Sequence, residues 1–183
     1  MKNRIPNWKQ VHTIIYDFDG VFTDNSVYID QDGLESVRCS RSDSLGIKFL
    51  NSFLHIKGSN IKQFILSTER NEVVKRRADK LKIQCFNGIE NKINFIKKYL
   101  KTNYENEISK EKGIIYLGND LNDLAAIKYC GYSIAPSDAH YKIKQSCDLV
   151  LENKGGEGFV RQFIEEFIGI EEFSPDELIK LLS

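Results

Sequence analysis

A mostly apolar run that ends in two aspartates constrains the fold of this chain more than any other stretch. Val11–Tyr16 lacks the alternation of a half-exposed strand, which is typical of a strand buried on both faces of a parallel sheet. Asp17 and Asp19 follow, and Gly20 lets the backbone turn away sharply. Residues two apart point the same way in an extended chain, so both carboxylates face one space. Because close carboxylates repel each other unless a cation offsets them, the stretch predicts a Mg2+ site at the end of a central strand.

Two other interpretations apply to the same residues. Aspartates before a glycine are common in turns, where their side chains accept hydrogen bonds from nearby backbone amides. A calcium-binding loop fits less well, because the glycine is in the wrong register and Tyr28 stands where such a loop needs a bidentate glutamate. From this segment alone, the ordinary turn stays open as the alternative.

Strand and helix patterns alternate along the rest of the chain. This alternation predicts an α/β, Rossmann-like parallel sheet with helices on both faces. Ligands bind beyond the carboxyl ends of the strands in such sheets, where Asp17, Ser67 and Asn119 are expected. The predicted strands are 11–16, 61–66, 83–86, 113–117, 132–135 and 148–151; the predicted helices are 43–54, 71–81, 89–100, 124–130, 139–145, 159–168 and 175–182, with a polar loop at 101–112.

The chain length of 183 residues suits one domain, 1–183. Inside it, two short extended runs joined by an Asp-Gly turn predict a small β-hairpin at about 26–39. This hairpin follows the acidic site directly, so we expect it to act as a flap, and a helical tail is expected at about 157–183. The expected helix caps are Ser42 or Asp43 for the helix at 43–54 and Ser174 for the helix at 175–182.

Composition predicts a soluble, cytoplasmic protein that does not bind nucleic acid or membranes. Lysine plus arginine number 26 and aspartate plus glutamate 26, so there is no basic excess for nucleic acid. No apolar stretch has the length of a signal-peptide core or a membrane span. Four well-separated cysteines are expected to be free, mostly buried thiols in a reducing compartment: Cys39, Cys85, Cys130 and Cys147.

Four groups of polar residues supply what phosphoryl transfer needs. They offer a carboxylate nucleophile, a second carboxylate for acid–base work, a neutral donor, a cation, and further amide or acidic oxygens. Charge builds on the equatorial oxygens of the transferred group, so fixed cations and donors must meet it there. The groups are Asp17 with Asp19, then Ser67, then Lys92, and finally Gly118-Asn119-Asp120 with Asp123.

These groups resemble, in order and in position, the four motifs of the haloacid dehalogenase superfamily of phosphatases. The resemblance covers about residues 14–168 and includes Asp17-x-Asp19-Gly20-Val21-Phe22-Thr23-Asp24 and Gly118-Asn119-Asp120-x-x-Asp123. It implies that Asp17 is the nucleophile and Asp19 the general acid and base, while Ser67 and Lys92 hold the phosphate. It also implies Mg2+ held by the Asp17 carboxylate, the Asp19 backbone carbonyl and the fourth motif.

The fourth motif departs from the family pattern at one position. Asn119 stands where the family usually has an aspartate. An amide oxygen can ligate Mg2+ but brings no charge. Asn119 and Asp120 are therefore joint candidates for the ligand, with Asp123 behind them.

The resemblance is closest to a small branch without a large cap domain, which dephosphorylates 3-deoxy-octulosonate 8-phosphate and its nine-carbon relatives. Two segments resemble this branch specifically, Arg41-Ser42-Asp43-x-x-Gly46-Ile47 and Gly155-Gly156-x-Gly158-x-Val160-Arg161. Its members are tetramers in which a neighbouring subunit closes the site, which implies a homotetramer here. Closure by a neighbour would exclude water from an open site.

The substrate-binding segment is similar to that of the nine-carbon enzymes. It implies contacts to the substrate from Thr68, Glu69 and Arg70. Arg77 and Lys80 share a helix face and are expected to clamp a 2-keto acid carboxylate, with ordinary solvated charge as the alternative. The expected reaction is Mg2+-dependent hydrolysis of a nonulosonate 9-phosphate, of the 2-keto-3-deoxynononate or N-acylneuraminate type, through an aspartyl-phosphate.

Three alternatives accompany this expectation. The first is a 3-deoxy-D-manno-octulosonate 8-phosphate phosphatase. The second is a non-catalytic oligomerisation domain associated with a cytidylyltransferase, which Asn119 mildly favours and the paired aspartates disfavour. The third, a phosphoacceptor signalling domain, fits poorly because no Asp-x-Asp-Gly turn is expected there.

Overall fold

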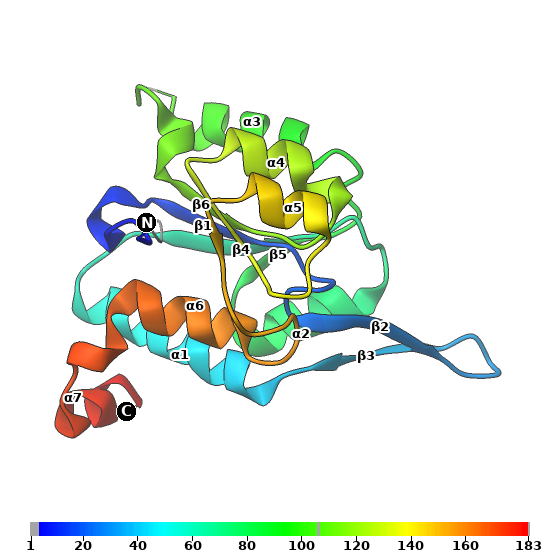
Figure 1. The fold of residues 1–183 in the computed structure, drawn as a ribbon, viewed down its shortest axis with the longest axis horizontal. Helices are drawn as coiled ribbons and strands as arrows, with labels where there is room; N and C mark the ends of the chain where they lie inside the picture. Colours follow the sequence, from blue (N-terminus) through cyan, green and yellow to red (C-terminus); the bar gives the residue numbers. More distant parts are fainter. Residues whose placement is uncertain (1–3, 106, 183) are drawn as a thin grey trace.

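The predicted α/β fold is confirmed in a computed structural model that describes residues 4–105 and 107–182. Positions 1–3, 106 and 183 belong to the predicted N-terminal segment, polar loop and C-terminal tail and lie outside the described residues. Six strands are β1 (Thr13–Tyr16), β4 (Lys62–Leu66), β5 (Gln84–Phe86), β6 (Ile114–Leu117), β7 (Tyr132–Ala135) and β8 (Leu149–Val150). They form one parallel sheet in the order β5-β4-β1-β6-β7-β8 (Figure 1).

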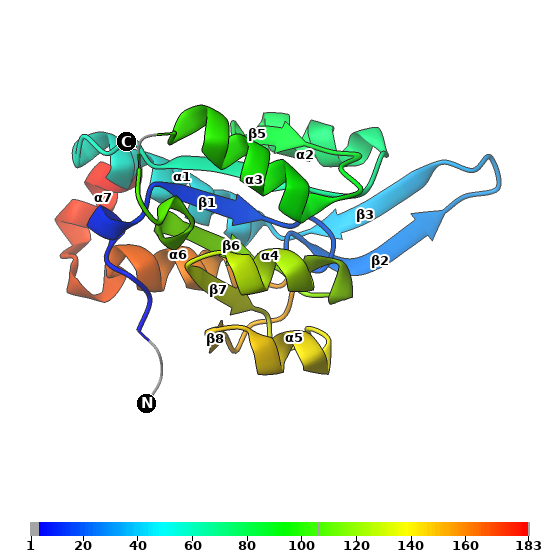
Figure 2. The same ribbon diagram turned by 90° about the horizontal axis from the view of Figure 1, so that it is seen from above.

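Helices cover both faces of this sheet. On one face lie α1 (Arg41–Ile56), α2 (Glu72–Leu81) and α6 (Phe159–Ile168), and on the other α3 (Lys92–Asn103), α4 (Leu124–Tyr129) and α5 (Tyr141–Ser146). Figure 2 shows the second group in front of the strands. The last helix, α7 (Pro175–Leu182), packs against α1. Short 3-10 turns are η1 (Trp8–Gln10), η2 (Lys110–Gly113), η3 (Leu121–Asp123) and η4 (Ile170–Glu172).

Alternate side chains of the central strand enter different hydrophobic layers. Ile14 and Tyr16 pack with α1, α2 and α6, whereas Ile15 packs with α3 and α4. All four residues of β1 are therefore buried. A strand covered on both faces needs residues that tolerate burial at every position, which is why its sequence does not alternate between apolar and charged residues.

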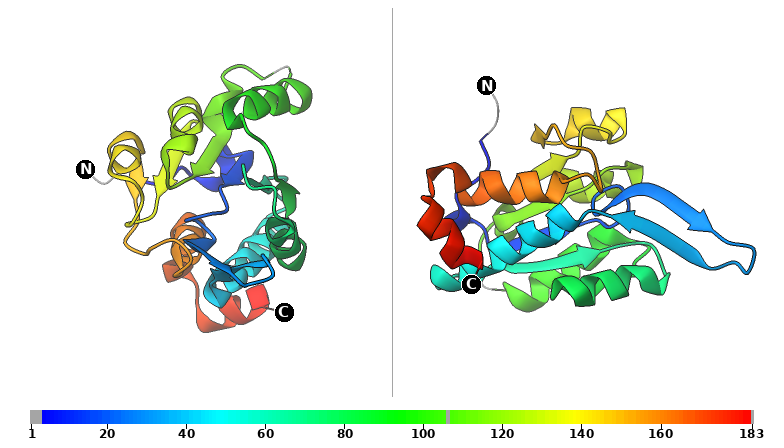
Figure 3. Two further views of the ribbon diagram at one scale, coloured as in Figure 1. Left: turned by 90° about the vertical axis from the view of Figure 1, so that its right-hand side faces the viewer. Right: turned by 90° about the horizontal axis from the view of Figure 1, so that it is seen from below.

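The predicted hairpin consists of β2 (Thr23–Ile29) and β3 (Glu35–Cys39). It is antiparallel, with Val27 opposite Val37, and it projects well beyond the sheet and helices (Figures 1 and 3). At its turn, Asp30 Oδ1 accepts hydrogen bonds from the backbone N–H groups of Asp32 and Leu34. The Asp-Gly turn predicted from the sequence is present, because Gly33 adopts a φ of 78° and its N–H donates to the Asp30 carbonyl at 3.1 Å.

Four helix starts differ from the sequence prediction: α2 begins at Glu72 rather than 71 and α5 at Tyr141 rather than 139, and the other two are α1 and α3. α1 begins at Arg41, and its cap is Ser40, whose hydroxyl accepts from Ser42 N, rather than Ser42 or Asp43. The helix predicted from residue 89 begins only at Lys92, after the cap Asn91. The backbone N–H of Ile89 instead donates to the carbonyl of Ser67 at 3.0 Å, so this segment is held to the sheet before the helix starts.

The four cysteines are free, as predicted, but the expectation that most are buried is wrong. Only Cys130 is buried. Cys39 ends the hairpin, Cys85 lies on the edge strand β5, and Cys147 follows α5 near the opposite edge. Edge positions are covered on fewer sides than central ones, which explains their partial exposure.

The predicted last helix begins as expected: Glu177 N donates to Ser174 Oγ, and the Glu177 carboxylate accepts from Ser174 N. Among residues 4–105 and 107–182, no helix is long and apolar enough to cross a membrane.

Candidate active site

The loops after β1, β4 and β6 meet at one edge of the sheet and enclose a cavity of about 300 Å3. β1 lies between β4 and β6, so the chain changes its direction across the sheet here, which is where α/β sheets bind ligands. Asp17, Ser67 and Gly118 each follow one of these strands. The cavity is lined by Asp17, Asp19, Asn25, Thr68, Asn119, Asp120 and Asn122.

Lys92 joins two carboxylates at the base of this site. Its Nζ lies 2.7 Å from Asp17 Oδ1 and 2.7 Å from Asp123 Oδ1. The side chains are 2% exposed for Lys92, 5% for Asp17 and 0% for Asp123. Because Lys92 is the first residue of α3, the start of that helix fixes where the ammonium enters. The arrangement carries two acidic groups for one cation, which favours a further positive charge nearby.

Burial raises the pKa of Asp17, and the charge of Asp123 raises it further. The Lys92 ammonium and the N–H of Phe18, 2.8 Å from Asp17 Oδ1, act in the opposite direction. Burial lowers the pKa of Lys92, but the two carboxylates outweigh it and the pKa is raised overall. Lys92 therefore keeps its proton at neutral pH and stays a cation beside the cavity.

Asp123 is saturated with hydrogen bonds from the protein. Its Oδ1 accepts from Lys92 Nζ and from the Tyr116 hydroxyl at 2.6 Å. Its Oδ2 accepts from the backbone N–H groups of Asn119 at 2.9 Å and Asp120 at 3.3 Å. With both oxygens occupied, Asp123 suits a role in positioning Lys92 and the 118–120 loop better than direct coordination of a metal.

Asp19 lies on the turn after β1, where Gly20 adopts a φ of 70°. The Thr23 hydroxyl lies 3.5 Å from Asp19 Oδ1 and accepts from Gly20 N at 3.1 Å, which ties the turn together. Burial raises the pKa of Asp19, and the nearby charge of Glu69 raises it further. A raised pKa extends the pH range over which a carboxyl keeps its proton.

The first and fourth motifs touch through Gly20 and Asn119. A Cβ at Gly20 would lie 1.8 Å from Asn119 Nδ2 and 3.0 Å from its Oδ1. Only glycine leaves room for the amide, and only glycine accepts the positive φ without strain. This close approach holds the Asn119 amide against the Asp17–Asp19 turn.

Ser67 is buried, and its Oγ accepts from the backbone N–H of Glu69 at 3.0 Å, which leaves its hydroxyl proton available to a ligand. Glu69 Oε1 accepts from the backbone N–H groups of Arg70 at 2.6 Å and Asn71 at 2.9 Å. The Glu69 carboxylate is thereby fixed near the rim. Thr68 lines the cavity itself.

The three predicted cationic substrate contacts lie outside the residues that line the cavity. Arg70 pairs with Glu90 at 2.5 Å on the surface, and Lys80 is exposed on α2. Arg77 is half-buried and donates to the Ser40 carbonyl and the Ser44 hydroxyl, both at 2.8 Å. Within one chain, Arg77 thus joins α2 to the start of α1.

Asn25 and Asn122 line the cavity but were not selected from the sequence. Asn25 has a φ of 62°, an unusual conformation for a residue other than glycine. Asparagine tolerates it better than most residues, and in the sequence Asn25 follows an aspartate directly before the predicted hairpin, whereas in the structure it is the third residue of β2. Such strain is often associated with functional sites.

The oxygen donors around the cavity fit a hard divalent cation. The described residues contain no cluster of three or more His, Cys, Asp or Glu side chains arranged to hold a metal. The oxygen groups that the lining residues offer are mixed: the carboxylates of Asp17 and Asp120 and the amide of Asn119, with Asp19 beside them. Carboxylate, amide and carbonyl oxygens are ligands of Mg2+, which usually keeps several waters as well.

Comparison with known proteins places this geometry in context. Residues 5–163 match the family model of the haloacid dehalogenase-like hydrolases. The chain is 31% identical over 167 residues to the 3-deoxy-D-manno-octulosonate 8-phosphate phosphatase of Haemophilus influenzae, covering 88% of this chain and 83% of that protein.

Two solved structures share the fold over nearly the full length. One is the Moraxella catarrhalis 3-deoxy-D-manno-octulosonate 8-phosphate phosphatase in complex with magnesium, phosphate and the sugar acid, with a TM-score of 0.78, 25% identity and coverage of 96% of this chain and 95% of that one. The other is the cobalt-bound Haemophilus influenzae enzyme, with a TM-score of 0.78, 27% identity and coverage of 96% and 99%.

Proposed function

This chain belongs to the haloacid dehalogenase-like hydrolase family, and we propose that it is a Mg2+-dependent phosphatase of a phosphorylated 2-keto-3-deoxy sugar acid. The observation that carries the proposal is the buried contact between Asp17 and Lys92 at 2.7 Å beside an open cavity. It combines a carboxylate nucleophile with a permanent cation for the phosphoryl oxygens.

Asp17 is the nucleophile in this proposal. Its Oδ1 is engaged by Lys92 and by Phe18 N, whereas no hydrogen bond to Oδ2 is found within the described part of the chain. Oδ2 attacks phosphorus, the bond to the sugar oxygen breaks, and an aspartyl-phosphate forms. Lys92 and the Ser67 hydroxyl donate hydrogen bonds to the equatorial oxygens and stabilise their negative charge.

Asp19 moves the protons. With its pKa raised, it donates a proton to the departing sugar oxygen, so the product leaves as an alcohol. The resulting carboxylate then takes a proton from water, which attacks phosphorus and releases phosphate and free Asp17. The proton that Asp19 takes from water replaces the one it gave to the sugar oxygen, so Asp19 ends the cycle protonated.

Mg2+ would be held by Asp17, the backbone carbonyl of Asp19 and Asn119, with Asp120 supplying charge directly or through water. When bound, it neutralises phosphate charge and orients the group for in-line attack. The magnesium in the Moraxella catarrhalis enzyme supports this cofactor.

A nonulosonate 9-phosphate is the proposed substrate. Support comes from Glu69. Its carboxylate is fixed by two backbone N–H groups, and its negative charge raises the pKa of Asp19. A carboxylate held in this way can accept hydrogen bonds from sugar hydroxyls on the far side of the phosphate. The clamp of the 2-keto acid carboxylate by Arg77 and Lys80 stays a prediction.

The second candidate substrate is 3-deoxy-D-manno-octulosonate 8-phosphate. The Haemophilus influenzae relative, which is 31% identical to this chain, is named for this activity, and that supports the second candidate. The two candidates share the phosphate and the 2-keto acid and differ in chain length.

Steady-state phosphate release from both sugar phosphates, with Mg2+ present, tests the proposal. We expect kcat/KM to favour the nine-carbon substrate, and Glu69→Gln to lower this preference by about tenfold. Asp17→Asn is the inactive control. A preference for the eight-carbon substrate would overturn the choice of sugar, and no release from either would overturn the phosphatase.

We further propose that the hairpin packs against other copies of the chain in a homotetramer, so that a neighbour closes the cavity. Four large apolar side chains on it are more than half exposed: Val27, Tyr28, Ile29 and Leu34. An apolar projection of this kind favours association. Light scattering should give a tetramer that Ile29→Lys dissociates, whereas Ile108→Lys, at an exposed residue outside the hairpin, leaves it intact; a monomeric parent protein would exclude this assembly.

A further inference from the structure

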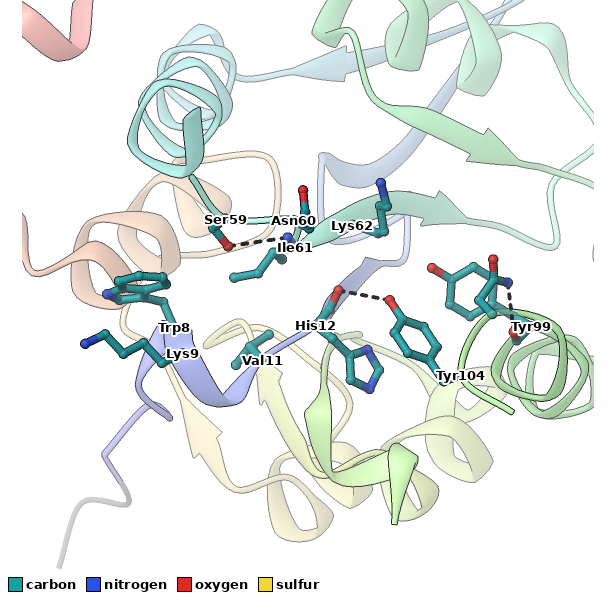
Figure 4. Close-up of a pocket in the computed structure, with 11 residues that line it drawn as sticks. Trp8, Lys9, Val11, His12, Ser59, Asn60, Ile61, Lys62, Tyr99 and Tyr104 are labelled. Atoms are coloured by element: carbon teal, nitrogen blue, oxygen red, sulfur yellow. Dashed lines mark hydrogen bonds between the residues drawn. The ribbon is translucent and has the colours of Figure 1, made fainter. Parts of the chain in front are cut away.

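We propose that a second pocket, at the opposite end of the sheet from the active site, binds an aromatic ring that carries an anionic group, of the nucleoside 5′-monophosphate class. The pocket lies where β1 and β4 begin, between η1, the end of α1 and the end of α3 (Figure 4). Its volume of about 500 Å3 is within the range of small-molecule sites, about 300–1,000 Å3.

The walls of the pocket are aromatic. The lining includes Trp8, Tyr99, Tyr104 and the imidazole of His12. The rings of His12 and Tyr104 are stacked, with centroids 4.0 Å apart and planes 28° from parallel. Trp8 packs edge-on against Phe53 of α1, which fixes the plane of the indole. Flat walls of this kind favour a planar ligand that stacks on them.

Hydrogen bonds hold the His12 side of the pocket in place. His12 Nε2 lies 2.7 Å from the Lys110 carbonyl, so this nitrogen carries the proton and donates it. His12 Nδ1 lies 2.8 Å from Thr13 Oγ1, which in turn lies 3.2 Å from the Tyr104 hydroxyl. A wall that is ordered before binding loses little entropy when a ligand arrives.

The charged side chains that line the pocket are all of one sign. Lys9 and Lys62 contribute two ammonium groups, and none of the described lining residues is acidic. No ion pair of Lys62 is found within residues 4–105 and 107–182, and the Lys9 ammonium lies over the Trp8 ring at 5.6 Å. Since the whole chain has a formal net charge of zero, this excess is local.

The anionic group belongs at the mouth of the pocket. The carboxyl ends of α1 and α3 both reach this side of the molecule and bring partial negative charge with them. Only the full charges of Lys9 and Lys62, which are exposed, outweigh these helix ends. The neutral groups Ser59, Asn60 and Asn103 remain for the polar edge of the ring.

Trp8 is the only tryptophan of the chain, so its fluorescence reports on this pocket. The full chain is titrated with AMP, with adenosine as the ring without charge and ribose 5-phosphate as the charge without ring. EDTA is present throughout, which removes divalent cations and stops hydrolysis at the active site. We expect saturable quenching by AMP, with a Kd at least about tenfold below that of either part.

Two lysine variants locate the site. Lys62→Gln should raise the Kd for AMP about fivefold or more, and Lys62→Arg should restore it, while the kcat/KM of phosphate release stays unchanged. Lys101→Gln, on the exposed part of α3 outside the lining, is the matched control and should change neither value.

Absence of saturable quenching by AMP would overturn the proposal. So would a Kd that Lys62→Gln leaves unchanged, because AMP would then bind elsewhere. Equal affinity for AMP and adenosine would remove the anionic part of the assignment. These results do not depend on the phosphatase reaction, which is switched off in the titration.

Discussion

The ammonium of Lys92 lies 2.7 Å from Oδ1 of Asp17, and almost nothing of either side chain reaches solvent. This contact connects the first residue of α3 with the first residue after β1, which are far apart in the chain. Asp123 shares the same ammonium at 2.7 Å. The three groups act as a unit, and the first two predictions follow from that.

Removing the cation should affect both stability and rate. Lys92→Met leaves two buried carboxyl groups without their shared cation, so we expect the free energy of unfolding to fall by about 3–5 kcal/mol. kcat should fall by about 10²–10³-fold, because the phosphoryl oxygens lose a fixed charge. Denaturant unfolding and phosphate release measure the two effects. Lys98→Met, exposed on the same helix, is the control and should be close to the parent protein.

The role of Asp123 separates positioning from metal coordination. In Asp123→Asn, an NH2 group must face donors that now face an oxygen, so kcat should fall at least about tenfold. The Mg2+ concentration for half-maximal activity should stay within about threefold of the parent value, since neither oxygen is free for a metal. Tyr116→Phe, which removes one hydrogen bond of 2.6 Å, should cost about 1 kcal/mol of stability. A large loss of Mg2+ affinity in Asp123→Asn would instead identify Asp123 as a ligand.

The contact between Gly20 and Asn119 should make Gly20 intolerant of any side chain. Gly20→Ala combines a positive φ with a methyl group that would lie 1.8 Å from the Asn119 amide. We expect a loss of stability above about 2 kcal/mol. We also expect weaker Mg2+ binding, so that a higher Mg2+ concentration is needed for half-maximal activity. Gly33→Ala has a similar φ of 78° with nothing within 4 Å and should cost only about 1 kcal/mol. Equal losses in the two variants would show that backbone strain alone matters.

Asn25 should contribute to substrate binding through its amide. Asn25→Gly removes the strain of the φ of 62°, which stabilises the folded chain, but it increases the conformational entropy of the unfolded chain. Because these effects oppose each other, its stability should stay within about 1 kcal/mol of the parent protein. Asn25→Ala keeps the strain and should be about 1 kcal/mol less stable than Asn25→Gly. Both variants lack the amide, and both should raise KM several-fold, with kcat changed less. An unchanged KM in both variants would mean that Asn25 only stabilises the local backbone conformation and does not bind the substrate.

Asp43 predicts a pH dependence of stability. Burial raises the pKa of Asp43 to about 6, although its Oδ1 accepts from Arg161 N at 2.9 Å. An unfolded aspartate titrates near 3.9, so the stabilising contribution is fully present below about pH 4 and is lost as pH rises through about 6. The shift corresponds to about 3 kcal/mol at most.

Asp43→Asn keeps an oxygen for Arg161 N but cannot ionise. Between pH 4 and 7, the free energy of unfolding of the parent protein should therefore fall relative to that of Asp43→Asn, as measured by urea titrations at each pH. A constant difference between the two proteins over this range would contradict the raised pKa.

The sequence by itself indicated the strands and helices and the residues of the candidate site. The mostly apolar run at 11–16 indicated burial on both faces, because each face of a central strand packs against a hydrophobic layer. Asp17, Ser67 and Asn119 were expected to meet because parallel strands end at one edge of the sheet, and the structure brings all three there. Local patterns sufficed, since they depend on neighbours in the chain.

Only the tertiary structure shows which groups these side chains contact. The motif made Asp123 a candidate metal ligand, and the structure surrounds it with four donors, from Lys92, Tyr116 and the 119–120 backbone, which favours a positioning role. Asp43 looked like the cap of its own helix but accepts from Arg161 of α6. The aromatic pocket around Trp8 and Tyr104 joins residues nearly a hundred positions apart. Hydrogen-bond partners and cavities of this kind depend on which surfaces pack together, and no local pattern in the chain records that.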